Sequence, residues 1–268
     1  MQALIDADIL LYEVGFACQY KDEDTGEIVP SSLEDVMECV DGKISLIQEL
    51  TWADEDPILY LTGKKNFREY VAVTKEYKGN RVQAKPFHYN NVKGYLIAMY
   101  DAIVVDGMEA DDALAIEQTK RNFEDCIICS RDKDLRMVEG NHFGWECGKQ
   151  PQFGPEYVDK LGRLELDDKG KIRGTGLRFF YSQLITGDTV DNIQGLPRCG
   201  DKKAFDTLDG CTTERQLYEA VRGAYQDKLG EDWLPLLREN AYLLWMVRSL
   251  DDKGRPVMWQ PPRKIDGR

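Results

Sequence analysis

Histidine is scarce in this chain, and its cysteines are scattered. The 268 residues include two histidines, His88 and His142, and seven cysteines, an odd number. Zinc sites are built mainly from clustered Cys and His side chains, so this composition argues against one. The C-x-x-C sequence at 126–129 encloses two isoleucines and is typical of a buried strand. We therefore expect reduced thiols in a core.

Long apolar runs are also absent. No stretch of about 18 apolar residues occurs, which argues against a membrane-spanning helix. The first residues, MQALIDADILLY, lack the basic region and the cleavage site of a signal peptide. We expect a cytoplasmic protein with no membrane partner. No heptad pattern is present, and we expect a monomer.

Acidic residues outnumber basic ones by 48 to 35, which gives a formal net charge of −13. A negative charge of this size opposes binding to a polyanion. The opposition weakens if many carboxylates are concentrated in one site, because bound cations reverse the local field. The positions of the acids along the chain therefore decide which partners are compatible with the charge.

Strand-length apolar runs alternate with segments of helical spacing through the first half of the chain. The strand-like runs lie at 3–6, 58–63, 102–107 and 125–130, and helical spacing is clearest at 33–50 and 92–101. This alternation predicts an α/β fold with a mostly parallel central sheet flanked by helices. A hairpin is predicted within 145–176. We expect an α/β core over 1–176 and a helical region over 177–268.

Acidic side chains follow three of these strands. They are Asp6 and Asp8 after the first, Glu109, Asp111 and Asp112 after the third, and Asp132 and Asp134 after the fourth. Because the carboxyl ends of parallel strands meet at one edge of a sheet, we expect these side chains to lie close together. Crowded carboxylates oppose one another's ionisation, and hard cations relieve that conflict.

Each acidic group taken alone also fits a helix N-terminus or a solvated turn. Their joint appearance at successive strand ends favours a metal site instead. A site rich in carboxylates and poor in His and Cys favours Mg²⁺ or Mn²⁺, and two such ions suit hydrolysis of a phosphate ester.

Five sequence motifs occur in a fixed order. They are LIDADILLY (4–12), YKGNR (77–81), MEADDALA (108–115), SRDKDL (130–135) and TGDTVDNIQGLPRCGDKKA (186–204). The ordered set resembles the 5′-nuclease (flap endonuclease) superfamily, and within it the bacteriophage 5′→3′ exonucleases. The resemblance spans about residues 3–205 and implies a PIN-like nuclease core. It also implies the host cytoplasm as the location if the chain is phage-encoded.

The resemblance implies two groups of functional residues in the nuclease core. The metal ligands would be Asp6, Glu109, Asp111, Asp112, Asp132 and Asp134, with Asp188 and Asp191 completing a second metal site. Lys78 and Arg81 would grip the scissile phosphate and the charge that develops on it.

The resemblance also implies DNA as the partner, offered as a duplex with a 5′ end, a flap or an RNA–DNA hybrid. Residues 186–204 would form a helix-three-turn-helix element whose glycine-rich backbone holds a K⁺ ion and meets duplex phosphates. Its implied DNA contacts are Gly195, Arg198, Gly200, Lys202 and Lys203.

Residues 64–93 correspond to the arch with which this family clamps a single strand. The segment is locally basic, and it includes Lys64, Lys65 and Arg68. Interleaved aromatic residues, Tyr77 among them, are suited to stacking on bases while the cations follow the backbone. A mobile, solvated loop is compatible with the same composition.

Three positions depart from the family pattern. Thr62 stands after the second strand, where an Asp is usual, so one ligand is replaced or acts through water. Ala7 and Asp8 follow Asp6 in place of a glycine, which makes Asp8 either a substitute carboxylate or a solvent-facing residue. Arg198 replaces the middle glycine of the loop and either weakens K⁺ binding or adds a phosphate contact.

Two other functions are compatible with parts of the sequence. In a phosphatase of the haloacid dehalogenase type, Asp6 would attack phosphorus and Asp8 would act as general acid. That hypothesis leaves the acids at 109–112 and 130–134 unexplained. A non-catalytic DNA-binding module is the other alternative, although a dense acid cluster is destabilising without metal. Hydrolysis of p-nitrophenyl phosphate without DNA cleavage would identify the phosphatase.

Overall fold

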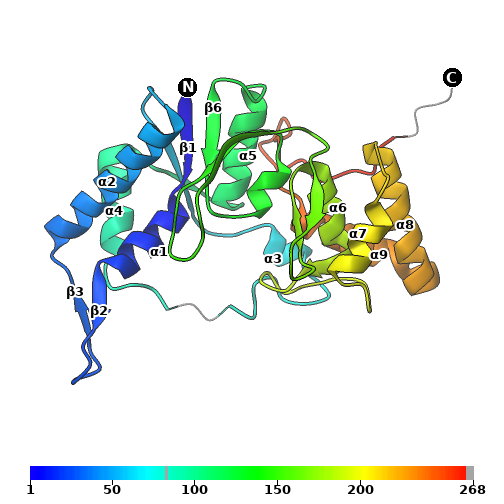
Figure 1. The fold of residues 1–268 in the computed structure, drawn as a ribbon, viewed down its shortest axis with the longest axis horizontal. Helices are drawn as coiled ribbons and strands as arrows, with labels where there is room; N and C mark the ends of the chain where they lie inside the picture. Colours follow the sequence, from blue (N-terminus) through cyan, green and yellow to red (C-terminus); the bar gives the residue numbers. More distant parts are fainter. Residues whose placement is uncertain (82–83, 264–268) are drawn as a thin grey trace. The chain divides into compact units, whose positions relative to one another are not determined.

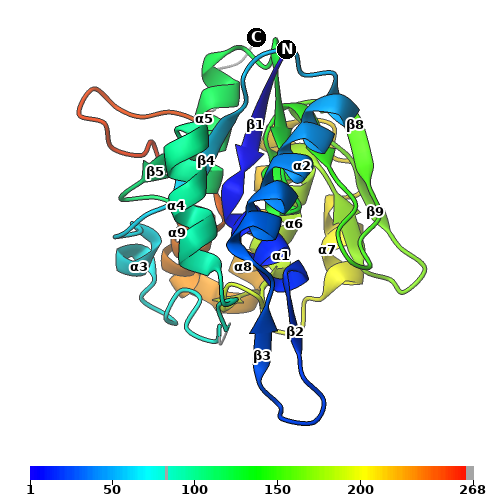
Figure 2. The same ribbon diagram turned by 90° about the vertical axis from the view of Figure 1, so that its left-hand side faces the viewer.

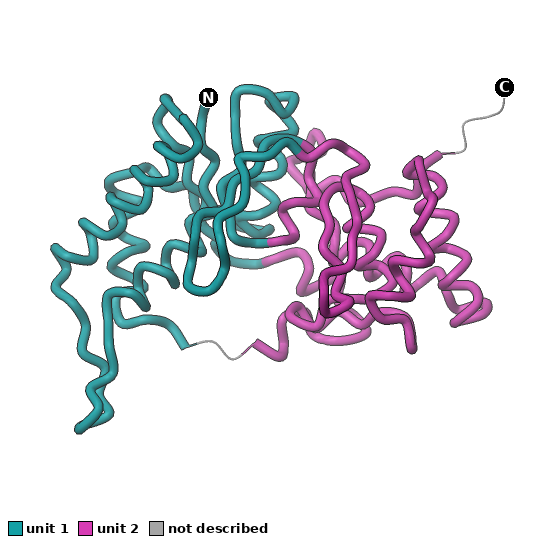
Figure 3. The backbone as a smooth tube through the Cα atoms, in the orientation of Figure 1, with its two compact units in different colours: residues 1–65, 82–132, 140–157 teal, residues 66–81, 133–139, 158–268 magenta. Residues whose placement is uncertain are grey.

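The computed structural model describes residues 1–81 and 84–263. The chain forms two compact units, shown in separate colours in Figure 3. The first contains residues 1–65, 82–132 and 140–157, and the second contains 66–81, 133–139 and 158–268. This division is discontinuous in sequence, so it differs from the simple boundary expected at residue 176. The predicted arch is likewise divided at residue 81, next to residues 82–83, which lie outside the described part.

A six-stranded sheet forms the centre of the first unit, in the order β5-β4-β1-β6-β7-β8. The strands are β1 (Gln2–Asp6), β4 (Ile58–Thr62), β5 (Ile103–Val105), β6 (Cys126–Cys129), β7 (Gly140–Gly144) and β8 (Phe153–Val158). The β1–β4, β1–β6, β4–β5 and β6–β7 pairs are all parallel. The four predicted strands are therefore present, and their carboxyl ends lie on one edge.

Helices cover both faces of this sheet. Helices α1 (Ala7–Ala17), α2 (Leu33–Thr51) and α4 (Tyr89–Tyr100) lie on one side, and α5 (Ala110–Lys120) packs against β1, β4 and β6 on the other (Figures 1 and 2). In α2, buried Val36, Val40, Ile44 and Ile47 recur at helical spacing. A small hairpin of β2 (Gln19–Lys21) and β3 (Ile28–Pro30) follows α1.

The second unit is mainly helical. Its helices are α3 (Arg68–Val71), α6 (Gly176–Thr186), α7 (Asp201–Leu208), α8 (Glu214–Leu229) and α9 (Trp233–Leu244), with 3₁₀ turns η1 (Asp134–Met137) and η2 (Gly230–Asp232). The predicted hairpin is present as β9 (Leu164–Leu166) and β10 (Ile172–Gly174). The buried helix α6 packs against α7, α8 and α9 and forms the core of this unit. Among the helices described, none is long and apolar enough to cross a membrane.

The connection between α6 and α7 depends on two glycines. Strands β11 (Gly187–Asp188) and β12 (Ile193–Gln194) pair in this connection. Gly187 has a φ of +70°, which favours glycine. A Cβ added at Gly195 would lie 2.2 Å from the carbonyl carbon of Thr186, so only glycine allows the two backbones to approach this closely.

Replacing Gly195 by alanine is expected to destabilise the protein by ~1–3 kcal/mol, because the new methyl group collides with rigid backbone. The matched control is Gly223→Ala in α8, where an added Cβ would meet no atom within 4 Å. The control is expected to stabilise by up to about 1 kcal/mol through helix propensity. Urea denaturation of both variants measures the difference, and equal midpoints would contradict the close approach.

Candidate active site

Asp6 is the buried acid at the carboxyl end of β1. Its side chain is 3% exposed, and Ser130, just after β6, donates a hydrogen bond of 2.7 Å to its carboxylate. The Ser130 hydroxyl in turn accepts from the backbone N–H of Asp132 at 2.9 Å. Burial, and then the nearby charges of Asp8 and Asp132, raise the pKa of Asp6 to about 7. Three predicted acids are thus electrostatically coupled at this edge of the sheet.

Thr62 links the second predicted acid to the helix that carries the next group. The Asp8 carboxylate accepts from the Thr62 N–H at 3.1 Å, and the Thr62 hydroxyl accepts from the Ala110 N–H at 2.9 Å. Burial raises the pKa of Asp8, and the charge of Glu109 raises it further. The hydrogen bonds from Thr62 and the charge of Lys93 lower it, but burial outweighs them. Thr62 therefore positions the start of α5, and Asp8 faces the end of β4.

The acids at the start of α5 differ in their roles. Glu109 is the N-cap residue, and the Asp112 carboxylate accepts from its backbone N–H at 3.2 Å, which completes a capping box. Asp112 is fully buried, and Glu109 is 8% exposed. Asp111 is partly exposed. The capping box engages both the Glu109 and the Asp112 side chains, and Asp111 is the most exposed of the three acids.

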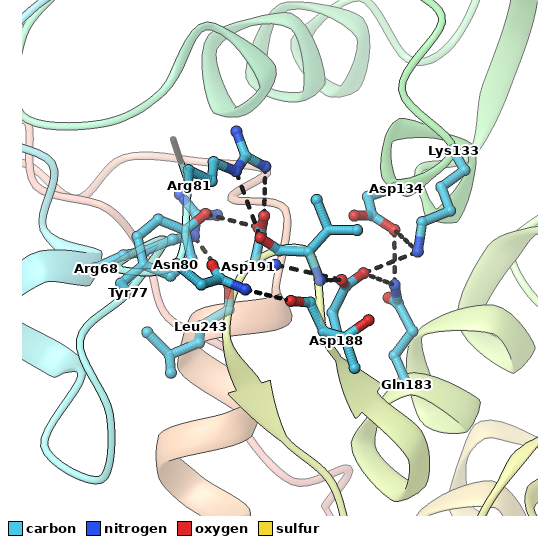
Figure 4. Close-up of polar contacts among 12 residues, drawn as sticks. Arg68, Tyr77, Asn80, Arg81, Lys133, Asp134, Gln183, Asp188, Asp191 and Leu243 are labelled. Atoms are coloured by element: carbon cyan, nitrogen blue, oxygen red, sulfur yellow. Dashed lines mark hydrogen bonds and ion pairs between the residues drawn. The ribbon is translucent and has the colours of Figure 1, made fainter. Parts of the chain in front are cut away.

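In the second unit, Lys133 connects two further acids. Its ammonium lies 2.8 Å from Asp188 and 3.7 Å from Asp134. Gln183 of α6 donates to Asp134 at 2.6 Å, as Figure 4 shows. Burial alone would raise the pKa of Asp188, but the Lys133 ammonium outweighs it and holds the pKa below its ordinary value. The structure thus brings Asp134 and Asp188 to a common lysine.

Asp191 binds the segment that carries Lys78 and Arg81. Its carboxylate accepts from the Tyr77 hydroxyl at 3.0 Å and pairs with the Arg81 guanidinium (Figure 4). Its backbone carbonyl accepts from the Lys78 N–H at 3.0 Å. Asn80 donates to the carbonyl of Thr189 at 2.8 Å. The YKGNR motif is therefore fixed on the turn at 188–192, with Asp191 as its main anchor.

The acids do not form a ready-made metal cluster. Within residues 1–81 and 84–263, no group of three or more His, Cys, Asp and Glu side chains is arranged to hold an ion. The metal ligands implied by the resemblance stay a prediction, and Ser130, Thr62 and Lys133 engage three of the carboxylates. The donor chemistry still fits a hard cation, because buried Asp6 is crowded by two neighbouring carboxylates whose repulsion a cation would relieve.

Two residues of the predicted DNA-binding set are buried. Arg68 is 1% exposed, and its guanidinium donates to the backbone carbonyls of Leu243 and Trp245. Tyr77 is 8% exposed, and its hydroxyl is bound to Asp191. The prediction that these two side chains meet DNA is therefore wrong. For Arg68 the reason is that a locally basic composition does not show which basic side chain is buried against backbone carbonyls. Lys64 and Lys65 are exposed.

The α6–α7 connection offers exposed backbone and cations. Arg198 is exposed and has a φ of +59°, so it adopts the left-handed conformation that a glycine would adopt more easily. Gly200, Lys202 and Lys203 line an open groove of about 580 Å³ together with Lys169 and Lys171 of the β9–β10 hairpin. The groove also contains Asp201 and Asp206. These positions are suited to phosphate contact.

Several residues of the site were not predicted from the sequence. Ser130 and Lys133 lie inside the SRDKDL motif, close to the predicted acids Asp132 and Asp134, and that position was the available signal. Asn80 lies inside YKGNR in the same way. Gln183 and the hairpin lysines, Lys169 and Lys171, lie outside all the sequence motifs. Their roles follow only from contacts between distant parts of the chain.

No family model matches the sequence. A 5′-3′ exonuclease of Buchnera aphidicola subsp. Schizaphis graminum is 23% identical over 230 residues, which cover 81% of this chain and 73% of that protein. DNA polymerase I of Rhizobium leguminosarum is 32% identical over 111 residues, which are 40% of this chain and 10% of the polymerase. DNA polymerase I of Bacillus subtilis is 26% identical over 247 residues, which are 85% of this chain and 25% of the polymerase. The chain therefore spans only a small part of these polymerases.

Among solved structures, the T5 D15 protein crystallised with metal ions matches with a TM-score of 0.56 and 15% identity, over 91% of this chain and 89% of that one. The chain has the fold of the T5 5′-exonuclease. The catalytic core of Rad2 in complex with DNA matches with a TM-score of 0.50 and 15% identity, over 97% and 83% of the two chains. The predicted α/β fold is confirmed, and the predicted 5′-nuclease superfamily is supported.

The buried Asp6 predicts a pH dependence of stability in the metal-free protein. Its pKa is raised in the folded state, to about 7 from 3.8, so the folded protein binds the proton more tightly than the unfolded chain. The contribution of Asp6 to stability is fully present below pH ~4 and is lost as the pH rises through ~7.

Asp6→Asn is therefore expected to be more stable than the parent in EDTA at pH 8, by on the order of a few kcal/mol. The difference should shrink at pH 4.5. Urea denaturation at the two pH values measures it, with Glu124→Asn, an exposed acid before β6, as the control. A difference that does not change with pH would contradict the raised pKa.

Proposed function

We propose that the chain hydrolyses phosphodiester bonds in DNA, working from a 5′ end with two divalent cations, Mg²⁺ or Mn²⁺. The observation that carries the proposal is the buried Asp6, crowded by Asp8 and Asp132 at the carboxyl edge of a parallel sheet. Support comes from the relatives named 5′-3′ exonuclease and DNA polymerase I, and from the T5 neighbour crystallised with metal ions.

The proposed ligands are the carboxylates at the ends of the parallel strands and in the 188–191 turn. They are Asp6, Glu109, Asp111, Asp112 and Asp132 of the first unit, and Asp134, Asp188 and Asp191 of the second. When bound, the cations would supply the charge that activates water and stabilises the leaving oxygen. Ser130 orients Asp6, and the α5 cap orients Glu109.

Lys78 and Arg81 would bind the scissile phosphate and stabilise its developing charge. Both lie on the YKGNR segment that Asp191 holds in place, which limits the freedom of the segment before substrate arrives. The backbone of 186–204, with a K⁺ ion and the side chains of Arg198, Lys202 and Lys203, would hold the phosphates of the downstream duplex. Flap cleavage and hydrolysis of RNA–DNA hybrids are included in the proposal.

The direct test is a gel of the products from end-labelled blunt, flapped and RNA–DNA hybrid substrates, with Mg²⁺, with Mn²⁺ and with EDTA. Short 5′-phosphorylated products are expected with metal and none with EDTA. Absence of cleavage on every substrate would refute the proposal. Turnover of p-nitrophenyl phosphate in its place would support the phosphatase.

Asp111→Ala and Asp132→Ala are expected to abolish cleavage, because each removes a proposed metal ligand. They are expected to spare DNA binding, because neither removes a basic side chain proposed to contact DNA. Single-turnover rates should fall by at least ~100-fold, while the Kd in EDTA changes by less than about threefold. Fluorescence anisotropy measures the Kd. The exposed Glu124→Ala is the control, and normal turnover in both variants would refute the assignment.

Lys78→Ala is expected to lower the single-turnover rate by ~10²–10³-fold and to raise the Kd much less, because the contact strengthens as charge develops on the phosphate. Lys120→Ala is the control, since that lysine is 76% exposed at the end of α5. An unchanged single-turnover rate would count against the proposed role of Lys78.

A further inference from the structure

Glu239 of α9 is a buried carboxylate bound to an exposed turn of the segment 66–81. It is 8% exposed, whereas Val73 in the turn is 82% exposed. One carboxylate oxygen accepts from the N–H groups of Val73 and Thr74, at 2.8 and 2.7 Å, and the other accepts from the Thr74 hydroxyl at 2.6 Å. Three donors on one carboxylate fix the direction of the turn as well as its position.

The same helix also binds the segment one turn further along. Leu243 lies four residues after Glu239, and its carbonyl accepts from the buried guanidinium of Arg68 at 2.9 Å. The carbonyl of Trp245 accepts from the same guanidinium at 2.8 Å. These carbonyls belong to the C-terminal end of α9, where a positive charge is favourable. Helix α9 therefore holds the segment at Arg68 and again at residues 73–74.

Beyond this turn the segment is bound by the 188–192 turn. Asn192 donates to the carbonyl of Glu76 at 2.9 Å, and the Lys78 N–H donates to the carbonyl of Asp191. Only three residues separate Thr74 from Lys78, so the turn at 73–74 limits the directions in which the chain can enter the YKGNR motif. Catalytic contacts tolerate little displacement, because a misplacement of about 1 Å can lower a rate by ~100-fold.

Helix α9 also binds the second proposed DNA-contact element. Asn240, adjacent to Glu239, donates to the carbonyl of Gln194 in β12 at 2.8 Å and to the hydroxyl of Tyr225 at 2.9 Å. Two consecutive residues thus tie the turn at 73–74 and the α6–α7 connection to one helix.

We infer that Glu239 is a positioning residue, which sets the register of Lys78 and Arg81 through the turn at 73–74. The inference rests on the proposed nuclease function. It assigns to α9, outside all the sequence motifs, the alignment of the phosphate-binding segment with the duplex-binding connection. Glu239 itself touches no substrate.

The test compares Glu239→Ala with the conservative Glu239→Gln, whose remaining carbonyl oxygen still accepts from the two N–H groups. The control is Glu231→Ala, an exposed acid in η2 just before α9. Each is measured for single-turnover cleavage of end-labelled duplex with Mg²⁺, for Kd in EDTA by anisotropy, and for urea midpoint.

Glu239→Ala is expected to lower the single-turnover rate at least ~10-fold with the Kd within about threefold, and Glu239→Gln is expected to recover most of that loss. In a Lys78→Ala background, Glu239→Ala should lower the rate no further, because both changes act through the same contact. A purely structural role predicts equal losses in both backgrounds.

Three results would overturn the inference while leaving the proposed function intact. They are a Glu239→Ala rate equal to that of Glu231→Ala, a loss that adds fully to that of Lys78→Ala, and a Glu239→Gln variant as impaired as the alanine. Failure of the unmodified protein to cleave any DNA is a different outcome and refutes the proposed function itself. Amide hydrogen exchange at Val73 and Thr74 then still reports whether Glu239 holds the turn, and unchanged exchange in Glu239→Ala would refute that contact.

Discussion

Asp8 and Asp132 repel the buried carboxylate of Asp6 at the edge of a parallel sheet, and hydrogen bonds from Ser130 and Thr62 hold Asp6 and Asp8 there despite that repulsion. The sheet supplies the edge, because β1 and β6 are neighbours and end together. Ser130 and Thr62 supply neutral donors, and the charge of Lys93 acts on Asp8, so the repulsion is reduced but not cancelled. In the metal-free protein a proton on Asp6 relieves this repulsion, and under the proposed function a divalent cation would relieve it instead.

In the second unit, by contrast, two of the acids are paired with basic side chains. Asp188 and Asp191 are neutralised within their own unit, by Lys133 and by Arg81. These pairs order the turn at 188–192, and under the proposed function the Arg81 side chain, already held by Asp191, would lose less entropy on meeting a phosphate than a free side chain would. The acids of the first unit thus lie beside neutral hydrogen-bond donors, while Asp188 and Asp191 of the second unit are paired with basic side chains.

Much of the fold could be predicted from local sequence, and less of the site. The apolar runs at 58–63 and 125–130 are strands because continuous apolar sequence suits a sheet covered on both faces. The acids at strand ends were identifiable for the same reason, since topology brings those ends together. Arg68 was misjudged, because composition cannot distinguish a cation that faces solvent from one that satisfies buried carbonyls. Glu239 gave no signal at all, because its partner Val73 is 166 residues away.

The discontinuous division of the chain has a consequence for how the protein is made. Helix α3 and the turn η1 belong to the second unit, but the ribosome delivers both long before α9, whose carbonyls receive Arg68. The second unit therefore cannot reach its final packing until the last quarter of the chain has emerged. A fragment that starts at residue 158 would lack residues 66–81 and 133–139 of the second unit. Neither unit is therefore one continuous segment that gene fusion or circular permutation could transfer intact.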